Sequence, residues 1–533
     1  MNEALRLSTL IPIHSSRLTA SVSVQSPKMY PTDMHSLPIE IYRMIAKSLC
    51  THCSRTEKVY TLSKITLYNL CLVDKKWHQA ATPSLYHAFE TSYDTNSILF
   101  GSSHDKAFES SQDKTFLAFL HTLIQHPNLA IHVKSLRLRP TYREWSWGNM
   151  KALRNDIRFR ALALGSPFSD HPELLADSNS NYLSRDCRGV LEEMLLLHTP
   201  NIVSIDFDWG AVEVDVHNIF KYLNTVAHCS QKWHGMRRLR HVKLDMRFPR
   251  NTPESHMTYL SRLATVAPSV QRLHTNLVNS LFPNWQDMDD ASSNYWAPVA
   301  VQLQIPTPTH IVTFLSSLRS IYIANFTGDV SFERTLGTHI GHCKSVEEVR
   351  YVSKSRYAAS FVQLIKPLSR TLKRFGLTQC YPRDNETIWD APHDDSVAVV
   401  KAIAGLTSLE ALRFDMAGSM SIFGHQESES ASMLIPLICA LPKSLRVLAI
   451  GGCKWVCLKQ GLSQLMDRVQ DGMLPNFRTL HVTCWIRTHY NPFIEAFADL
   501  GIEMVIHSQM EHPLGPNGLF SEGWTHMVEG RFS

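Results

Sequence analysis

The sequence predicts an α/β protein in which a small helical segment precedes a long array of parallel strands with helices on one face. Two observations carry this prediction. Apolar residues with helical spacing gather between positions 36 and 90, and one short apolar pattern returns many times beyond residue 115. A composition of 44 % hydrophobic and 19 % charged residues indicates a folded chain, because disordered chains lack the apolar surface that offsets ordering entropy.

The amino-terminal helical segment has apolar residues at Leu37, Ile41, Ile45 and Leu49, an i, i+4 series that draws one stripe along a helix. A second apolar stretch from residue 65 to residue 77 predicts another helix, and Pro83 should end the helix that follows it. About fifty residues can hardly bury so much apolar surface alone. We therefore expect part of this surface to contact a neighbour, either the rest of the chain or another protein.

Three pieces of this segment occur in the order found in one known domain. They are Leu37-Pro38-x-Glu40-Ile41-x-x-x-Ile45, then Leu70-Cys71-Leu72-Val73-Asp74-Lys75-Lys76-Trp77, then Thr82-Pro83-Ser84-Leu85-Tyr86. Residues 36–90 thus resemble an F-box of the fungal type, a domain that docks the Skp-type adaptor of a cullin–RING ubiquitin ligase. The resemblance implies that the adaptor is bound by the residues at matching positions, which are Leu37, Pro38, Ile41, Ile45, Leu70, Val73 and Trp77.

The segment departs from that pattern between Cys50 and Thr66, where the two halves are separated by more residues than most F-boxes need. We expect this insertion to loop out between helices. The alternative interpretation of residues 36–90 is an ordinary helical cap on the following domain.

Beyond residue 115 the returning pattern is apolar, two variable, apolar, one variable, apolar. Its last two apolar positions alternate with a variable one, which is the period of a strand. Apart from two longer gaps, the copies are 25 to 37 residues apart. The middle positions are Leu136, Ile205, Val242, Leu273, Ile321, Val349, Phe375, Leu412, Leu448, Leu480 and Val505.

Helix-like stretches separate these predicted strands, at 114–125, 189–198, 218–228, 310–318, 358–368, 397–406, 432–441 and 460–469. Short alternating strands and helices build a parallel sheet with helices on one side. Residues 115–510 resemble a leucine-rich-repeat solenoid of the irregular kind that follows many F-boxes, although the asparagine ladder of regular repeats is mostly absent. Insertions interrupt the pattern near 139–186, 283–298 and 381–395, and the ends are predicted to be a disordered leader (1–35) and a tail (511–533).

No arrangement for catalysis, cofactor binding or metal binding stands out, so we predict a protein that is not an enzyme. Phosphate-loop, nucleotide-binding, nucleophile-elbow and zinc-protease motifs are all missing from the sequence. Cys50-x-x-Cys53 lacks a second ligand pair, and so does the His342-Cys343 dipeptide with His339 before it. A doubly wound sheet enzyme is disfavoured because it would need fewer strands and a phosphate loop.

Two features suggest where a repeat array would bind a protein substrate. Tryptophans inside the insertions, Trp145, Trp147 and Trp389, are either tucked against the scaffold or held out as binding anchors. The basic run from Arg237 to Lys243 is either a solvated strand edge or a patch for an acidic or phosphorylated partner segment.

The resemblance leads to one functional expectation. It predicts a substrate-receptor subunit of a cullin–RING ligase that binds a Skp-type adaptor and, through it, a cullin and a RING protein, with no cofactor. The alternative is an interaction scaffold outside ubiquitination. A net charge of +5 is too dilute to favour nucleic acid, and no apolar run is long enough to favour a membrane. Eleven cysteines without a disulfide framework favour the cytoplasm or nucleus.

Overall fold

The computed structural model describes the protein in segments. They are residues 37–50, 53, 60–91, 105–138, 145–146, 155–159, 162, 182–183, 185–213, 220–229, 236–248, 253–279, 309–325, 340–353, 365–379, 400–415, 431–451, 455–484 and 490–508. The predicted leader and tail, the insertions at 283–298 and 381–395, and most of the insertion at 139–186 lie outside these segments.

Three helices form the amino-terminal unit, which we call the box (residues 37–91): α1 (Ile39–Ser48), α3 (Tyr60–Val73) and α4 (Lys75–Tyr86). The side chain of Asp74 caps α4 by accepting a hydrogen bond from the Trp77 backbone N–H at 2.8 Å. In the interior, Tyr42 of α1 meets Trp77 edge to face, with ring centroids 4.6 Å apart. Ala46, Leu67 and Ala81 bring the three helices together in a second small core.

Two local predictions for the box are wrong. The helix α4 continues through Pro83 to Tyr86, because a proline in the last turns removes only one backbone hydrogen bond while packing of α4 against α1 and α3 is retained. The insertion after Cys50 is shorter than expected, since residues 60–66 form the first turns of α3 instead of a loop.

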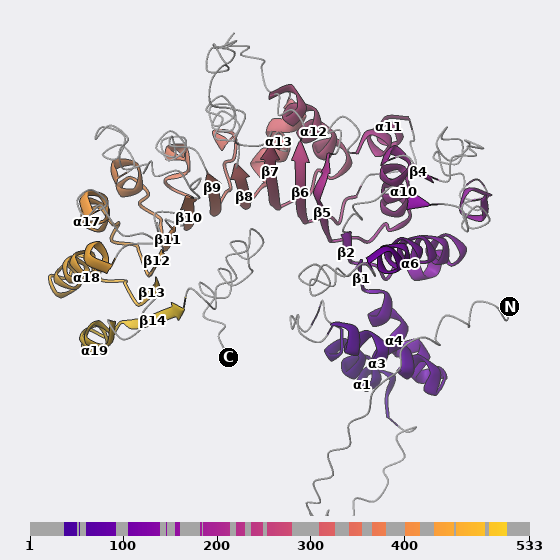
Figure 1. Ribbon diagram of the computed structural model, residues 1–533, viewed down its shortest axis with the longest axis horizontal. Coiled ribbons are helices and arrows are strands. Elements are labelled where there is room, and N and C mark those ends of the chain that lie inside the picture. Colours follow the sequence, from indigo (N-terminus) through magenta and orange to yellow (C-terminus); the bar gives the residue numbers. More distant parts are fainter. Residues whose placement is uncertain are drawn as a thin grey trace, which may run out of the picture.

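The main sheet has twelve strands, all parallel to their neighbours, in the order β1-β2-β5-β6-β7-β8-β9-β10-β11-β12-β13-β14. Figure 1 shows the strands along the inner side of an arc, with the box beside its first strand. The strands are β1 (Ala88–Glu90), β2 (Ser135–Leu138), β5 (Ser204–Glu213), β6 (His241–Phe248), β7 (Arg272–Asn279), β8 (Ser320–Asn325), β9 (Glu348–Ser353), β10 (Arg374–Gln379), β11 (Ala411–Asp415), β12 (Val447–Gly451), β13 (Thr479–Cys484) and β14 (Glu503–Ser508).

The helices lie on the outer side of the arc (Figure 1) and bury the apolar side of the sheet. Those predicted between strands are confirmed where the structure describes them, except that the described part of 358–368 is a 3₁₀ turn. The sequence missed α7, α12 and α19. The helical elements are α6 (Asp105–Gln125), α7 (Pro127–Ala130), α10 (Arg185–His198), α11 (Lys221–Cys229), α12 (Pro253–Val266), α13 (Thr309–Ser317), the 3₁₀ turn Lys366–Leu368, the turns at 400–404, α17 (Ala431–Cys439), α18 (Trp455–Gln470) and α19 (Asn491–Asp499).

The predicted middle positions from Leu136 to Leu480 stand in one register across ten neighbouring strands, and all are buried. The position assigned to Val505 is wrong, because Met504 is the residue that pairs with Leu480. One strand of the twelve-stranded sheet was not predicted: Phe89 of β1 extends the same row by pairing with Leu136. The sheet therefore begins inside the 36–90 segment.

Two ladders of hydrogen bonds join the repeats. The carbonyl of the residue before each strand of the main sheet from β1 to β12 accepts two backbone N–H groups of the next repeat, as when Glu347 accepts from Lys373 and Arg374 at 2.8 and 2.9 Å. Serine and asparagine side chains form the second ladder by donating to a carbonyl of the preceding repeat. The pairs are Asn201 to Ile131 at 2.9 Å, Ser317 to Val270 at 3.1 Å, Ser408 to Arg370 at 3.0 Å, Ser444 to Leu409 at 2.8 Å and Asn476 to Lys443 at 3.1 Å.

The fold class predicted from the sequence is confirmed: helices precede an α/β solenoid of parallel strands backed by helices. The part of the 139–186 insertion that is described holds two short strands, β3 (Trp145–Ser146) and β4 (Tyr182–Leu183), which pair antiparallel outside the main sheet. Within the described segments, every helix is too short or too polar to cross a membrane.

Truncation of Leu448 tests the packing of the array. Leu448 is 1 % exposed and lies between strands on both sides, so Leu448→Ala should lower the free energy of unfolding by about 2–5 kcal/mol. Met473→Ala, at a side chain that is 45 % exposed, is the control and should change it by less than about 0.5 kcal/mol. Urea denaturation followed by circular dichroism measures both, and equal midpoints for the two variants would contradict this packing.

Candidate interaction surfaces

The box exposes apolar side chains on two of its helices. Seven of the eleven large hydrophobic residues that are exposed in the described segments belong to it: Ile41, Met44, Ile45, Ile65, Tyr68, Leu72 and Val73. On α1 they are spaced i, i+3, i+4, and on α3 they recur at i, i+3, i+7 and i+8, so each set forms one helix face. Exposed apolar surface concentrated in one unit indicates a binding surface. We call these residues the apolar faces of the box.

The predicted adaptor residues divide between this surface and the interior. Ile41 and Ile45 are 37 % and 38 % exposed, and Val73 is 61 % exposed. Pro38 is exposed as well, ahead of α1. The apolar stripe predicted on this helix is therefore partly exposed to solvent, because Tyr42 and Ala46 are the residues of α1 that face the core.

Three of the predicted residues pack inside the box. Trp77 is only 7 % exposed, and the half-buried Leu37 and Leu70 contact the cluster that it forms with Tyr42. Substituting Trp77 would therefore disturb the fold of the box as well as any surface it contributes to. The sequence missed Met44 and Leu72, which are among the most exposed apolar side chains, although their positions on the two helical faces were a signal that could have found them.

The inner face of the sheet carries one continuous row of side chains, which we call the inner row. It runs Glu90, Arg137, Asp206, Lys243, His274, Tyr322, Arg350, Gly376, Arg413, Ala449, His481 and Val505, one residue from each strand. The first four alternate in charge and pair: Arg137 lies 3.2 Å from both Glu90 and Asp206, and Lys243 lies 3.2 Å from Asp206. These contacts keep that end of the face close to neutral.

The middle of the inner face is richer in arginine. Glu348 is buried and lies 2.6 Å from Arg350 and 3.3 Å from Arg374. Burial by itself would raise the pKa of the Glu348 carboxyl, but the two arginines outweigh burial and hold that pKa below its usual value. In the inner row, Gly376 lies between Arg350 and Arg413, so no side chain separates their stems.

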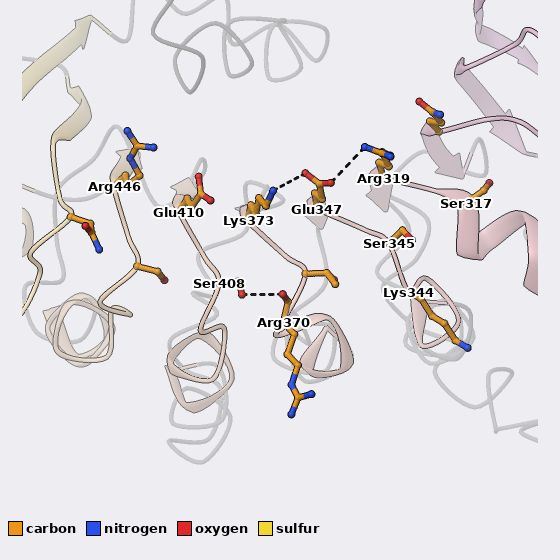
Figure 2. Close-up of a pocket in the computed structure, with 14 residues that line it drawn as sticks. Ser317, Arg319, Lys344, Ser345, Glu347, Arg370, Lys373, Ser408, Glu410 and Arg446 are labelled. Atoms are coloured by element: carbon orange, nitrogen blue, oxygen red, sulfur yellow. Dashed lines mark hydrogen bonds and ion pairs between the residues drawn. The ribbon is translucent and has the colours of Figure 1, made fainter.

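A groove of about 910 Å³ follows the turns that lead into the strands from β7 to β13. Figure 2 shows Arg319, Glu347, Lys373, Glu410 and Arg446 side by side along it, one from each repeat. Glu347 lies 3.8 Å from Arg319 and 3.3 Å from Lys373. Five basic side chains line the groove against two acidic ones, an excess of three positive charges. Such a surface favours an acidic partner segment.

Of the basic run read from the sequence, Lys243 belongs to the inner row. Arg240 is held instead by the backbone, since its guanidinium donates to the carbonyls of Arg237 and Ser269 at 3.0 and 2.9 Å. The run is therefore divided between the inner face and the turn before β6. The side chain of Trp145 and the whole of Trp147 and Trp389 lie outside the described residues, so their binding role stays a prediction.

Two cysteines and a histidine meet where the box joins the sheet. The Cys50 and Cys53 sulfurs lie 3.5 and 3.4 Å from Nδ1 of His87. Burial raises the pKa of the Cys53 thiol to about 11, and Cys50 beside it adds to that effect. No further metal ligand for the Cys50-x-x-Cys53 pair was evident from the sequence, because His87 follows more than thirty residues later. In contrast, Cys343 is buried in the main core, where desolvation raises its pKa to about 12.

Comparison with protein-family models gives no match, and comparison with curated proteins gives none either. Among solved structures, the chain is similar to the leucine-rich repeat-containing protein LegL7 from Legionella pneumophila. The sequence identity is 12 % and the TM-score is 0.31, and the alignment covers 62 % of this chain and 92 % of that one.

The pH dependence of stability tests the burial of His481. Desolvation, with smaller contributions from His507 and Arg413, lowers the pKa of His481 from 6.5 to about 4, and its Nδ1 lies 3.1 Å from Nε2 of His507. At a pH between about 4 and 6.5, the His481 imidazole is protonated in the unfolded chain but neutral in the folded chain. Stability is therefore complete above pH 6.5 and is lost as the pH falls toward 4, by up to about 1.4 kcal/mol per pH unit from this residue.

His481→Gln should flatten that loss by removing the titrating group. Urea denaturation at pH 7, 6 and 5 measures the slope, with His126→Gln at an exposed position as the control for removing an imidazole. A His481→Gln slope as steep as that of the wild type would show that His481 is protonated in the folded protein.

Proposed function

We propose that this chain is a non-catalytic substrate-receptor subunit of a cullin–RING ubiquitin ligase, in which the box binds a Skp-type adaptor. The observation that carries the proposal is the concentration of exposed apolar side chains on α1 and α3, in the segment whose sequence resembles an F-box. Surface of this kind is stabilised by a partner that removes it from water.

The solenoid supplies the second half of the proposed function. Its inner face and the groove beside it present basic side chains from many consecutive repeats, which suits an extended acidic segment of a protein substrate. Holding adaptor and substrate on one chain raises the local concentration of substrate lysines near the charged conjugating enzyme. No catalytic group of this chain is needed for that mechanism.

Copurification of the tagged chain with a Skp-type adaptor tests the proposal. Met44→Glu and Val73→Glu change side chains that are 66 % and 61 % exposed, so each should leave the fold intact while placing a charge in the apolar contact. We expect each to weaken adaptor binding by on the order of 2 kcal/mol, roughly 30-fold.

Ile131→Glu is the matched control, because Ile131 is an exposed aliphatic residue outside the box, after α7. It should retain the adaptor at the wild-type ratio, and thermal unfolding should confirm that all three variants are folded. Absence of the adaptor with the wild-type chain, or equal retention by all variants, would contradict the proposal. The box would then be a cap on an interaction scaffold that acts outside ubiquitination.

A further inference from the structure

The junction between the box and the sheet holds three possible metal ligands. Cys50 follows the end of α1, Cys53 lies one turn further on, and His87 is the residue after α4. The backbone N–H of Cys53 donates to the Cys50 carbonyl at 3.0 Å, which holds the two cysteines close together. Their sulfurs and a ring nitrogen of His87 all lie within 4.8 Å of one another.

The spacing fits a shared metal better than it fits hydrogen bonding alone. A neutral imidazole nitrogen has one lone pair or one N–H and so forms one good hydrogen bond, yet both sulfurs approach the same Nδ1, at 3.5 and 3.4 Å. In a tetrahedral zinc site with Zn–S of about 2.3 Å and Zn–N of about 2.0 Å, sulfur and nitrogen are about 3.5 Å apart. One ion between the three atoms satisfies all of them.

We propose that Cys50, Cys53 and His87 bind a zinc ion that fastens the box to the first repeat. Two thiolates and an imidazole are ligands that zinc favours over magnesium or calcium. The two thiolate charges balance the charge of the ion in a site where Cys50 is 2 % exposed. Three protein ligands leave one coordination position, which a water molecule can fill.

The position of His87 gives this ion its structural effect. The His87 carbonyl accepts the backbone N–H groups of Lys134 and Ser135 at 2.9 and 3.1 Å, which is the first rung of the carbonyl ladder. The His87 ring, on the other side, faces the thiols at the end of α1. Zinc therefore links the helix that carries Ile41 and Met44 to the edge of the sheet, and it fixes the direction in which the apolar faces point.

Metal analysis of the full-length chain tests the proposal. The protein is purified from zinc-supplemented cells under reducing conditions without chelators, and its zinc is measured by mass spectrometry. We expect about one zinc per chain in the wild type and at least a tenfold loss in the Cys50→Ser/Cys53→Ser variant. Cys71→Ser is the matched control and should keep the zinc, since Cys71 is a half-buried cysteine of the same box that is not one of the three clustered ligands. Its sulfur lies 3.7 Å from the Thr82 hydroxyl instead.

A second measurement uses the wild-type chain, so that the test does not depend on whether the double variant folds. Wild-type chain stripped of metal is titrated with cobalt(II), and thiolate-to-cobalt charge-transfer absorption together with the visible bands of a tetrahedral ion should grow to one equivalent. His87→Ala should weaken cobalt binding at least tenfold while leaving thiolate charge transfer detectable. Wild-type protein without zinc that also gives no cobalt bands would overturn the proposal, as would a wild-type metal content that the double variant retains in full.

Discussion

The fold depends on the carbonyl ladder that leads from one repeat to the next. At each step a single backbone carbonyl accepts two N–H groups at the start of the following strand, from His87 before β1 to Arg446 before β12. This rung sets the register of each strand on its neighbour, and the register in turn brings every middle residue into the same buried row. Each repeat contacts only its neighbours. A shift of one of these hydrogen-bond pairs would therefore shift the register of every later strand relative to the earlier ones.

The same register organises the surface opposite the core. Side chains alternate along a strand, so residues that flank the buried positions are aligned into the inner row across twelve strands. Near the box this row is a series of compensated charges, whereas in the middle of the arc arginines of adjacent strands surround Glu348. Charge is therefore distributed along the array by the alignment of residues from successive strands.

Periodicity predicted most of the array because a residue buried between sheet and helix has to be apolar. It failed at β14, where Met504, Val505 and Ile506 are all apolar and so give no alternation that would set the register; the rung from Glu503 N–H to the Arg478 carbonyl sets it instead. Phe89 was missed because β1 is only three residues long.

Within the box, the helical spacing predicted α1 correctly but not which side of it is buried. Tyr42 and Ala46 offer a second apolar face beside Ile41 and Ile45, and only the packing of α3 and α4 decides between the two faces. The meeting of Cys50 with His87 had no sequence signal at all, since it arises from the tertiary contact between the ends of α1 and α4.

The central claim is that the apolar faces of the box form the adaptor contact, and hydrogen–deuterium exchange of the chain with and without a Skp-type adaptor tests it most directly. The account predicts slower exchange in peptides covering α1 and α3, where the exposed apolar residues lie, and unchanged exchange in strands β8 to β13. Protection confined to the solenoid, or none in the presence of excess adaptor, would contradict it.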